Sequence, residues 1–243
     1  MGRSNKKLPR LILSLVLVLC QAFSFVPVNA DTAEETKPKE KITSAHNGKD
    51  FVKGVSKLSK NYRIAASSKK GMPELSGAEG VDYGGSCVMS FKSKKDYDAA
   101  LKELDKKNVD YTVDGSVGIC AIDLNANGKE VKVNPNAKTK ICIIDTGSNM
   151  ANEKVSLLGD DGSDKNGHGT SMSKIILRQT NDAYIISVKA IGDNGKGRLS
   201  DVYAGVRYAI DHKADYILMA ISLKNNGDYD GFVSLVKEAK KAG

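Results

Sequence analysis

From Lys140 onward the sequence alternates short apolar runs with stretches of helical periodicity, and this alternation limits the possible folds more than any other feature. Three apolar runs have the length of strands: 141–144, 184–190 and 216–223. One helix is predicted to begin near His168, Ser200 is expected to cap another, and a last helix is predicted over 230–242. Alternating strands and helices form right-handed βαβ units, so we expect an α/β domain with a parallel sheet over 138–243.

A second, smaller unit is predicted over 81–125. Residues 87–91 alternate as a strand does, and Ser93 can cap the helix that follows, with Asp96 three residues later. Two more strands are predicted, over 109–113 and 117–122. The unit is therefore an α+β module of about 40 residues, which is too small to be very stable alone.

The segment 31–80 is rich in Lys, Ser, Glu and Gly and has weak periodicity. Such a composition favours a solvated linker, largely irregular, with one short helix around 51–58.

Residues 1–30 have the layout of a secretory signal peptide. A basic start runs into an apolar stretch, and Val28 and Ala30 put small residues at the −3 and −1 positions of a cleavage site. We expect cleavage after Ala30 and a secreted, extracellular protein. The alternative is an uncleaved membrane anchor, because 11–30 carries no charge and has just enough residues to span a bilayer. Membrane contact is expected only in that case.

The net charge of +8 suggests a nucleic-acid partner at first. Without 1–30, which hold four basic residues and no acidic one, the charge falls to +4. From Lys140 onward 14 basic residues face 13 acidic ones. No basic domain remains to hold a phosphate backbone, so nucleic-acid binding is not expected.

Two polar motifs follow the first strand of the α/β domain. Asp145 comes directly after the run 141–144, and His168 lies between two glycines in Asn-Gly-His-Gly-Thr. The carboxyl edge of a parallel sheet is where α/β proteins place their sites. An Asp that holds one imidazole nitrogen leaves the other free as a general base. Taken alone, each residue is as easily read as a helix cap.

Together, Asp-Thr-Gly after an Ile-rich strand and Asn-Gly-His-Gly-Thr resemble the subtilisin-like serine proteases. Residues 187–197 are similar to that family's strand and substrate-binding loop, and the resemblance covers about 140–243. It implies a secreted endopeptidase that hydrolyses peptide or protein substrates and requires no cofactor. By resemblance Asp145 orients His168, the general base. A substrate strand would pair with five residues of the cleft: Gly195, Lys196, Gly197, Ser222 and Leu223.

The resemblance also implies what the 243 residues do not contain. The family's oxyanion-hole Asn and nucleophilic Ser come later in the chain, so we expect only the N-terminal half of a catalytic domain, inactive alone. Ser171, in Gly-Thr-Ser-Met, is similar to the nucleophile motif, but it lies only three residues after His168. It is therefore not expected to be the nucleophile. The module over 81–125 resembles the family's propeptide, an intramolecular partner that blocks the cleft. The alternative is a non-catalytic secreted paralogue that binds peptides or a protease.

The sequence predicts no metal site. Residues 123–128 open like a calcium-binding EF-hand loop, but Asn134 stands at the twelfth position, and a hairpin turn is favoured. Asp160, Asp161 and Asp164 could gather a Ca²⁺ ion, although a solvated loop is the preferred interpretation. A disulfide between Cys87 and Cys120 is one option; a disulfide framework is excluded.

Overall fold

The computed structural model describes residues 40–120, 130–224 and 229–242, all within one compact unit, Lys37–Gly243. The expected signal peptide and the turn over 123–128 lie outside the described residues. Within those three ranges, no helix has the length and apolar character needed to cross a membrane.

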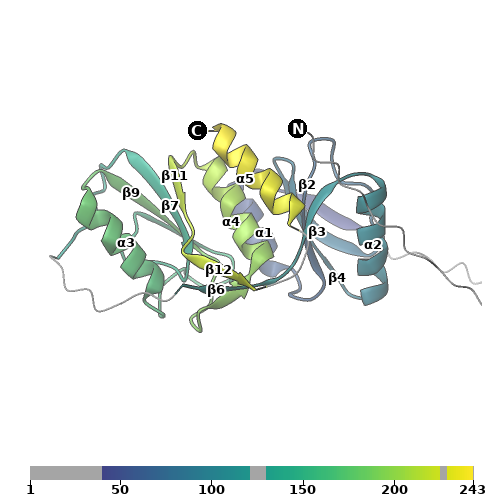
Figure 1. The fold of residues 1–243 in the computed structure, drawn as a ribbon, viewed down its shortest axis with the longest axis horizontal. Coiled ribbons are helices and arrows are strands. Elements are labelled where there is room, and N and C mark those ends of the chain that lie inside the picture. The colour runs from purple at the N-terminus through teal and green to yellow at the C-terminus, as the bar shows by residue number, and fades with distance from the viewer. Residues whose placement is uncertain (1–39, 121–129, 225–228, 243) are drawn as a thin grey trace, which may run out of the picture. The chain divides into compact units, whose positions relative to one another are not determined.

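A five-stranded sheet organises the N-terminal part of the described chain (Figure 1). Its order is β1-β3-β4-β2-β5, and β1 runs parallel to β3 while the other pairs are antiparallel. The strands are β1 (Lys41–Ser44), β2 (Arg63–Ser67), β3 (Ala78–Tyr83), β4 (Ser86–Phe91) and β5 (Asp110–Val113). Two helices accompany them, α1 (Gly48–Lys57) and α2 (Lys94–Lys106).

The linker predicted over 31–80 is therefore wrong for its described part, although the short helix expected within it is confirmed as α1. The sequence does not predict strand β2, because Arg-Ile-Ala-Ala-Ser is short and most of its side chains are small. It is buried by elements far along the chain, which is tertiary context rather than local propensity.

Side chains alternate between the two faces of this sheet, as the period of a strand requires. Ile64, Ala66 and Met89 pack against α2. Ala65 and Val88 point the other way, into the main core of the molecule. The predicted cap of α2 is confirmed, because Ser93 Oγ accepts a hydrogen bond from the Asp96 N–H at 3.1 Å.

The predicted parallel sheet is confirmed over the second half of the chain. It has the order β11-β7-β9-β8, with every pair parallel. Its strands are β7 (Thr139–Asp145), β8 (Glu153–Ser156), β9 (Ala183–Lys189) and β11 (Tyr216–Leu218). Helix α3 (His168–Gln179) packs on one face through Met172, and helix α4 (Leu199–Asp211) packs on the other through Val202. The fold is thus α/β, with a layer of helix on each side of the sheet.

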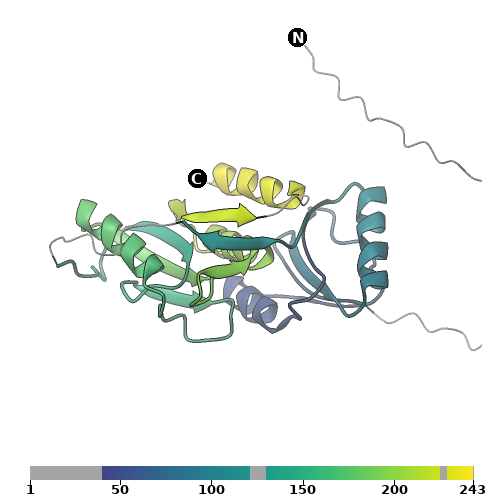
Figure 2. The same ribbon diagram turned by 60° about the horizontal axis from the view of Figure 1, so that its bottom comes forward.

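A third sheet joins the two halves. Strand β6 (Ser116–Ile119) lies between β10 (Lys196–Arg198) and β12 (Ile221–Lys224) and is antiparallel to both (Figure 2). Two expectations are corrected here. The run 216–223 breaks into β11 and β12, which belong to different sheets. The strand predicted over 117–122 leaves the small module and pairs with the second half of the chain, because it finds two partners there.

The N-terminal five-stranded sheet packs on two helices of the second half. Tyr203 Oη, on α4, donates to the carbonyl oxygen of Ala66 on β2 at 2.8 Å. Helix α5 (Asp230–Ala242) meets β5, where the Phe232 N–H donates to Thr112 Oγ1 at 2.7 Å. The expected cap of α4 by Ser200 is wrong: Arg198 is the N-cap residue, and the Ser200 N–H is satisfied by Asp114.

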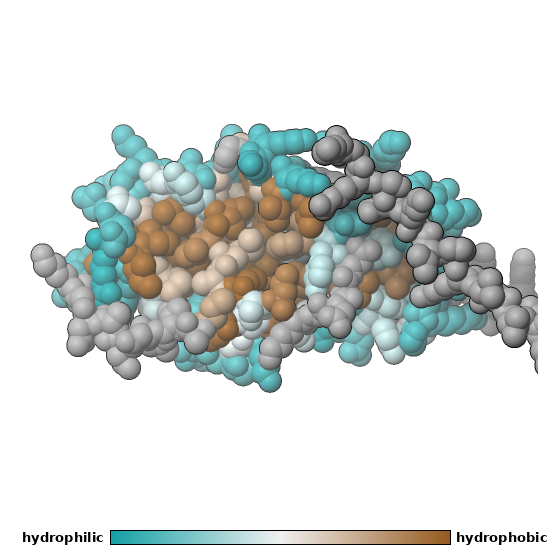
Figure 3. Space-filling view, in the orientation of Figure 1, coloured by the Kyte–Doolittle hydropathy of each residue, from teal (hydrophilic) through white to brown (hydrophobic). Residues whose placement is uncertain are grey.

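An apolar surface lies exposed beside β11, an edge strand of the described parallel sheet. A groove of about 950 Å³ runs between α4, β11 and α5. Tyr216 of β11 is 64% exposed, and Val233 and Val236 of α5 are also exposed. The face in Figure 3 is correspondingly apolar near its centre, where Figure 1 places β11 and α4.

An ion pair ties α5 to α4 and yields a pH prediction. Arg207 donates to both carboxylate oxygens of Glu238, at 2.9 and 2.8 Å. These hydrogen bonds hold the pKa of Glu238 below 4.5, although burial opposes them. A depressed pKa stabilises the folded state above pH 4.5, and that contribution is lost as the pH falls through the folded-state value. We expect Glu238→Gln to lower the thermal midpoint near neutral pH but not in strong acid. An equal loss at both pH values, or the same loss for Glu103→Gln, would contradict the assignment.

Candidate active site

The two residues singled out by sequence, Asp145 and His168, lie in direct contact. Asp145 ends strand β7, and His168 is the first residue of α3. His168 Nδ1 lies 2.8 Å from Asp145 Oδ1 and 2.9 Å from Oδ2. Both side chains are 1% exposed. The predicted contact is confirmed.

Glycines allow the two segments to approach so closely. A Cβ atom at Gly169 would lie only 2.1 Å from the carbonyl oxygen of Gly147. Gly147 itself has φ of +99°, and Gly167, before His168, has φ of +95°. These are left-handed conformations that side-chain-bearing residues avoid. The glycines of both motifs are therefore required by the geometry that brings the carboxylate to the imidazole.

The Asp145 carboxylate is buried yet fully hydrogen-bonded. Burial raises its pKa, while the hydrogen bonds to His168 and to the Thr146 N–H act in the opposite direction. The Thr146 N–H reaches Asp145 Oδ1 at 2.7 Å. A buried carboxylate held in this way fixes the orientation and tautomer of the imidazole and can stabilise its protonated form.

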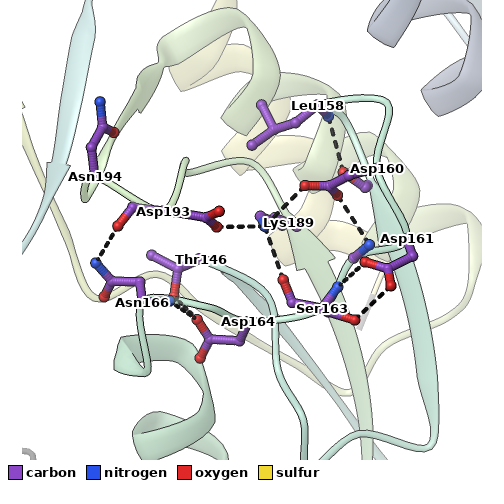
Figure 4. Close-up of polar contacts among 12 residues, drawn as sticks. Thr146, Leu158, Asp160, Asp161, Ser163, Asp164, Asn166, Lys189, Asp193 and Asn194 are labelled. Atoms are coloured by element: carbon purple, nitrogen blue, oxygen red, sulfur yellow. Dashed lines mark hydrogen bonds and ion pairs between the residues drawn. The ribbon is translucent and has the colours of Figure 1, made fainter.

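Asp164 forms hydrogen bonds with the residues next to Asp145 and His168. Its carboxylate accepts a hydrogen bond from the Thr146 hydroxyl at 2.9 Å (Figure 4). It also accepts from the Gly167 N–H at 2.8 Å and from both the N–H and the hydroxyl of Thr170. It thus satisfies N–H groups at the start of α3 that have no helical partner. Burial alone would raise the pKa of Asp164, but the hydrogen bonds hold it below its ordinary value.

We expect Asp164→Ala to lower the free energy of unfolding by about 2 kcal/mol, since it removes a helix cap and leaves the hydroxyl protons of buried Thr146 and half-buried Thr170 without their acceptor. Urea unfolding measures this loss. Asp161→Ala, in the same loop, is the control, because Asp161 is exposed and its carboxylate bonds Ser163, outside α3. Equal losses from the two variants would show that Asp164 has no special part in holding α3.

The carboxylates considered as calcium ligands serve separate partners. Asp160 pairs with Lys189 at 3.0 Å, Asp161 bonds Ser163, and Asp164 bonds Thr146 and Thr170. Within the described ranges, no group of three or more His, Cys, Asp or Glu side chains is arranged to hold a metal ion.

Lys189 is a site residue that the sequence analysis missed. Its side chain is 1% exposed, and its ammonium group donates to the Ser163 carbonyl at 2.9 Å and pairs with Asp193 at 2.8 Å and Asp160 at 3.0 Å (Figure 4). It joins the loop before His168 to the turn before β10. The sequence feature that could have indicated this role is the single lysine in the apolar run 184–190, because a buried lysine is rare unless its charge is paired.

The five residues predicted to line a substrate cleft flank a single strand, which belongs to the chain itself. Gly118 of β6 is opposite Lys196 on one side and Ser222 on the other. Val117 is opposite Gly197 and Leu223 in the same way. The Ile119 N–H donates to the Gly195 carbonyl at 3.1 Å. The predicted residues are therefore brought together, around residues 116–119.

This strand leads to the Asp–His pair. The Cys120 carbonyl oxygen lies 2.9 Å from His168 Nε2. A carbonyl only accepts, so Nε2 is the donor in this contact. Sequence reasoning missed residues 116–120 as part of the site because their pattern fits any strand of the small module.

The structure also bears on two alternatives from the sequence, Ser171 as a nucleophile and a disulfide between Cys87 and Cys120. Ser171 Oγ donates to the Gly167 carbonyl at 2.9 Å, within the first turn of α3. Across the described ranges, no serine hydroxyl is hydrogen-bonded to His168. Cys87 and Cys120 are both free thiols, the first buried in β4 and the second exposed after β6, so the optional disulfide is not formed.

Comparison with known proteins finds serine proteases. The chain is 28% identical over 117 residues to a subtilisin-like protease of Coccidioides posadasii, covering 42% of this chain and 30% of that protein. It is 30% identical over 128 residues to the major intracellular serine protease of Bacillus subtilis, covering 43% and 40%. A subtilisin-like serine protease of Rhodotorula mucilaginosa is 34% identical over 88 residues, covering 31% and 26%. No family model matches the chain. The matched regions span 26–40% of the length of these curated relatives.

Proposed function

We propose that this chain, which is similar to subtilisin-like serine proteases, provides the Asp–His part of a secreted endopeptidase that hydrolyses peptide or protein substrates. One observation carries the proposal. A peptide strand, β6, lies between two cleft strands and brings a backbone carbonyl to 2.9 Å from the imidazole of a buried Asp–His pair. The contact places the peptide bond after Cys120 beside His168, whose Nε2 donates here and can accept a proton once a serine hydroxyl takes the place of the carbonyl.

The chemistry follows from the roles of the two side chains. A serine Oγ attacks the carbonyl carbon while its proton passes to His168 Nε2, and the same proton is then given to the departing amine. Asp145 holds the ring and stabilises the imidazolium. These steps use side chains alone and require no cofactor. We propose that the serine and the oxyanion-hole donors come from polypeptide that the 243 residues do not include.

Residues 40–120 act, in this proposal, as an intramolecular propeptide. The support is that the five-stranded module packs on α4 and α5 while β6 fills the cleft. The bond after Cys120 is then the one presented for cleavage. The signal peptide over 1–30, cut after Ala30, would export the precursor.

A fluorophosphonate probe tests this function, because it phosphonylates serines that a neighbouring base has activated. We expect the protein expressed from its natural gene to be labelled, and His168→Ala to abolish the label. The 243-residue chain alone should stay unlabelled, since its described serines make no contact with His168 Nε2.

His212→Ala is the matched control, because His212 stacks on Tyr208 away from the Asp145–His168 pair. Unchanged labelling of His168→Ala would contradict the proposal. Absence of label in the natural protein would favour the alternative, a non-catalytic protein that binds peptides.

A further inference from the structure

The ammonium group of Lys189 is matched, proton for proton, by oxygen partners. Its three N–H donors meet the Ser163 carbonyl at 2.9 Å, Asp193 Oδ1 at 2.8 Å and Asp160 Oδ2 at 3.0 Å (Figure 4). The side chain is only 1% exposed. A buried charge is costly unless it is paired and hydrogen-bonded, so moving either carboxylate away from the ammonium carries a penalty in free energy. Lys189 therefore holds its partners in place.

These partners come from two segments of the candidate active site. Two of them lie in the loop 157–167, which leads into His168 at the start of α3. The third lies in the turn 190–195, which leads into the cleft strand β10. Lys189 itself ends β9, beside Asp145 in the register of the parallel sheet. The ammonium group thus joins the segment before the base to the segment before the cleft strand.

Asn166 makes a second link between the same two segments. Its Nδ2 donates to the Asp193 carbonyl at 2.9 Å (Figure 4), and its Oδ1 accepts from the His168 N–H at 3.3 Å. Asp193 is therefore held through its carboxylate by Lys189 and through its backbone by Asn166. Together the two links fix the position of the turn relative to the start of α3.

The turn carries a hydrogen-bonding group of the cleft. The Gly195 carbonyl accepts from the Ile119 N–H at 3.1 Å, and the Gly195 N–H donates to the Gly192 carbonyl at 2.8 Å. Because the turn is closed on itself in this way, a displacement of Asp193 also moves the Gly195 carbonyl. A misplacement of about 1 Å away from the reacting atoms can cost on the order of 100-fold in rate. The turn therefore controls how far the backbone of a bound peptide lies from His168.

The imidazole has support of its own. Asp145 holds the ring, and Asp164 accepts from N–H groups at the start of α3. Removal of the Lys189 ammonium should therefore leave the Asp–His pair assembled and loosen the turn.

We propose that Lys189 is a positioning residue, which sets the cleft strand β10 at the correct distance from His168 by holding Asp193. This inference rests on the proposed function. It makes Lys189 important for substrates that pair with the turn and β10 through several residues. Substrates that consist of little more than the residue beside the base should depend on it far less.

Two esters with the same nitrophenol leaving group test this role in the protein expressed from its natural gene. Acetyl-Val-Gly-Ile-Ala ester copies 117–119 and can pair along the cleft, whereas acetyl-Ala ester lacks the N–H that Ile119 gives to the turn. We expect Lys189→Met to lower kcat/KM about 30-fold for the long ester and less than about threefold for the short one. Lys189→Arg, which keeps the cation, should recover most of the loss. Lys154→Met, at an exposed lysine of β8, is the control and should change neither rate. Equal losses with the two esters would overturn the inference, because a general loss of folded protein affects both alike.

Hydrogen exchange in the 243-residue chain gives a second measure that needs no catalysis. We expect Lys189→Met to speed exchange of the Ile119 N–H about tenfold, because its acceptor on the turn is loosened. The Thr170 N–H, which donates to Asp164, should exchange at its original rate. Unchanged exchange at Ile119 would overturn the inference. If the unaltered natural protein hydrolyses neither ester, the proposed function fails, and exchange at Ile119 still decides whether Lys189 holds the turn.

Discussion

Asp145→Asn is expected to lower kcat for peptide hydrolysis about 10⁴-fold in the protein expressed from its natural gene. The amide keeps the shape of the carboxylate but donates where the carboxylate accepts. Because His168 Nδ1 lies 2.8 Å from this group, the ring is then held in the wrong tautomer, and Nε2 no longer accepts the proton of a nucleophile. Steady-state rates with a fluorogenic peptide measure the loss, and KM should change little because the buried carboxylate acts on the imidazole rather than on the substrate.

A double variant separates catalysis from folding. Asp145→Asn combined with His168→Ala should be no slower than His168→Ala alone, since the carboxylate acts only through the imidazole. His212→Ala should retain the full rate. Additive losses in the double variant would show that Asp145 contributes independently of His168.

Arg63→Met is expected to cost about 3–5 kcal/mol of unfolding free energy, the usual effect of leaving one partner of a buried ion pair alone. Arg63 is 1% exposed, and its guanidinium pairs with Asp201 at 2.7 Å. It also donates to the carbonyls of Val55 and Leu58, and so ties β2, the end of α1 and α4 together. Burial raises the pKa of Asp201, with Arg63 acting against it, so the carboxylate depends on this cation. Denaturant unfolding measures the loss.

Two further variants check the cause of that loss. Lys60→Met removes a second, 39% exposed partner of Asp201 and should cost under about 1 kcal/mol. Arg63→Met combined with Asp201→Leu should recover part of the stability, because no buried charge is left unpaired. If the Arg63 and Lys60 variants lost equal unfolding free energy, the buried ion pair between Arg63 and Asp201 would not be the cause.

The second half of the chain was predictable because its signals are local. The apolar runs around Ile143 and Ile186 and the glycines beside His168 specify strand, helix and turn within a few residues each. The contact between Asp145 and His168 then follows from the parallel sheet, whose strands end at the same edge. Their short separation in sequence, 23 residues, makes this the easiest long-range contact to foresee.

The first half was predicted less well because its order depends on distant partners. Strand β2 is buried by helices that include α2 and α4, and its sequence has no alternation that local reasoning could use. Strand β6 could be predicted as a strand but not assigned to a sheet, since both of its neighbours come about 80 or more residues later. Lys189 and Asp114 likewise acquire their roles only when segments distant in sequence meet.

The central claim is that residues 116–120 lie in the cleft as a substrate does, with the following peptide bond presented to His168. Mapping the amino termini of the purified natural protein by mass spectrometry tests it most directly. The account predicts a mature terminus at Ala121, and its absence from the His168→Ala protein. A terminus elsewhere, such as within 87–113, or a terminus at Ala121 that forms without His168, would contradict it.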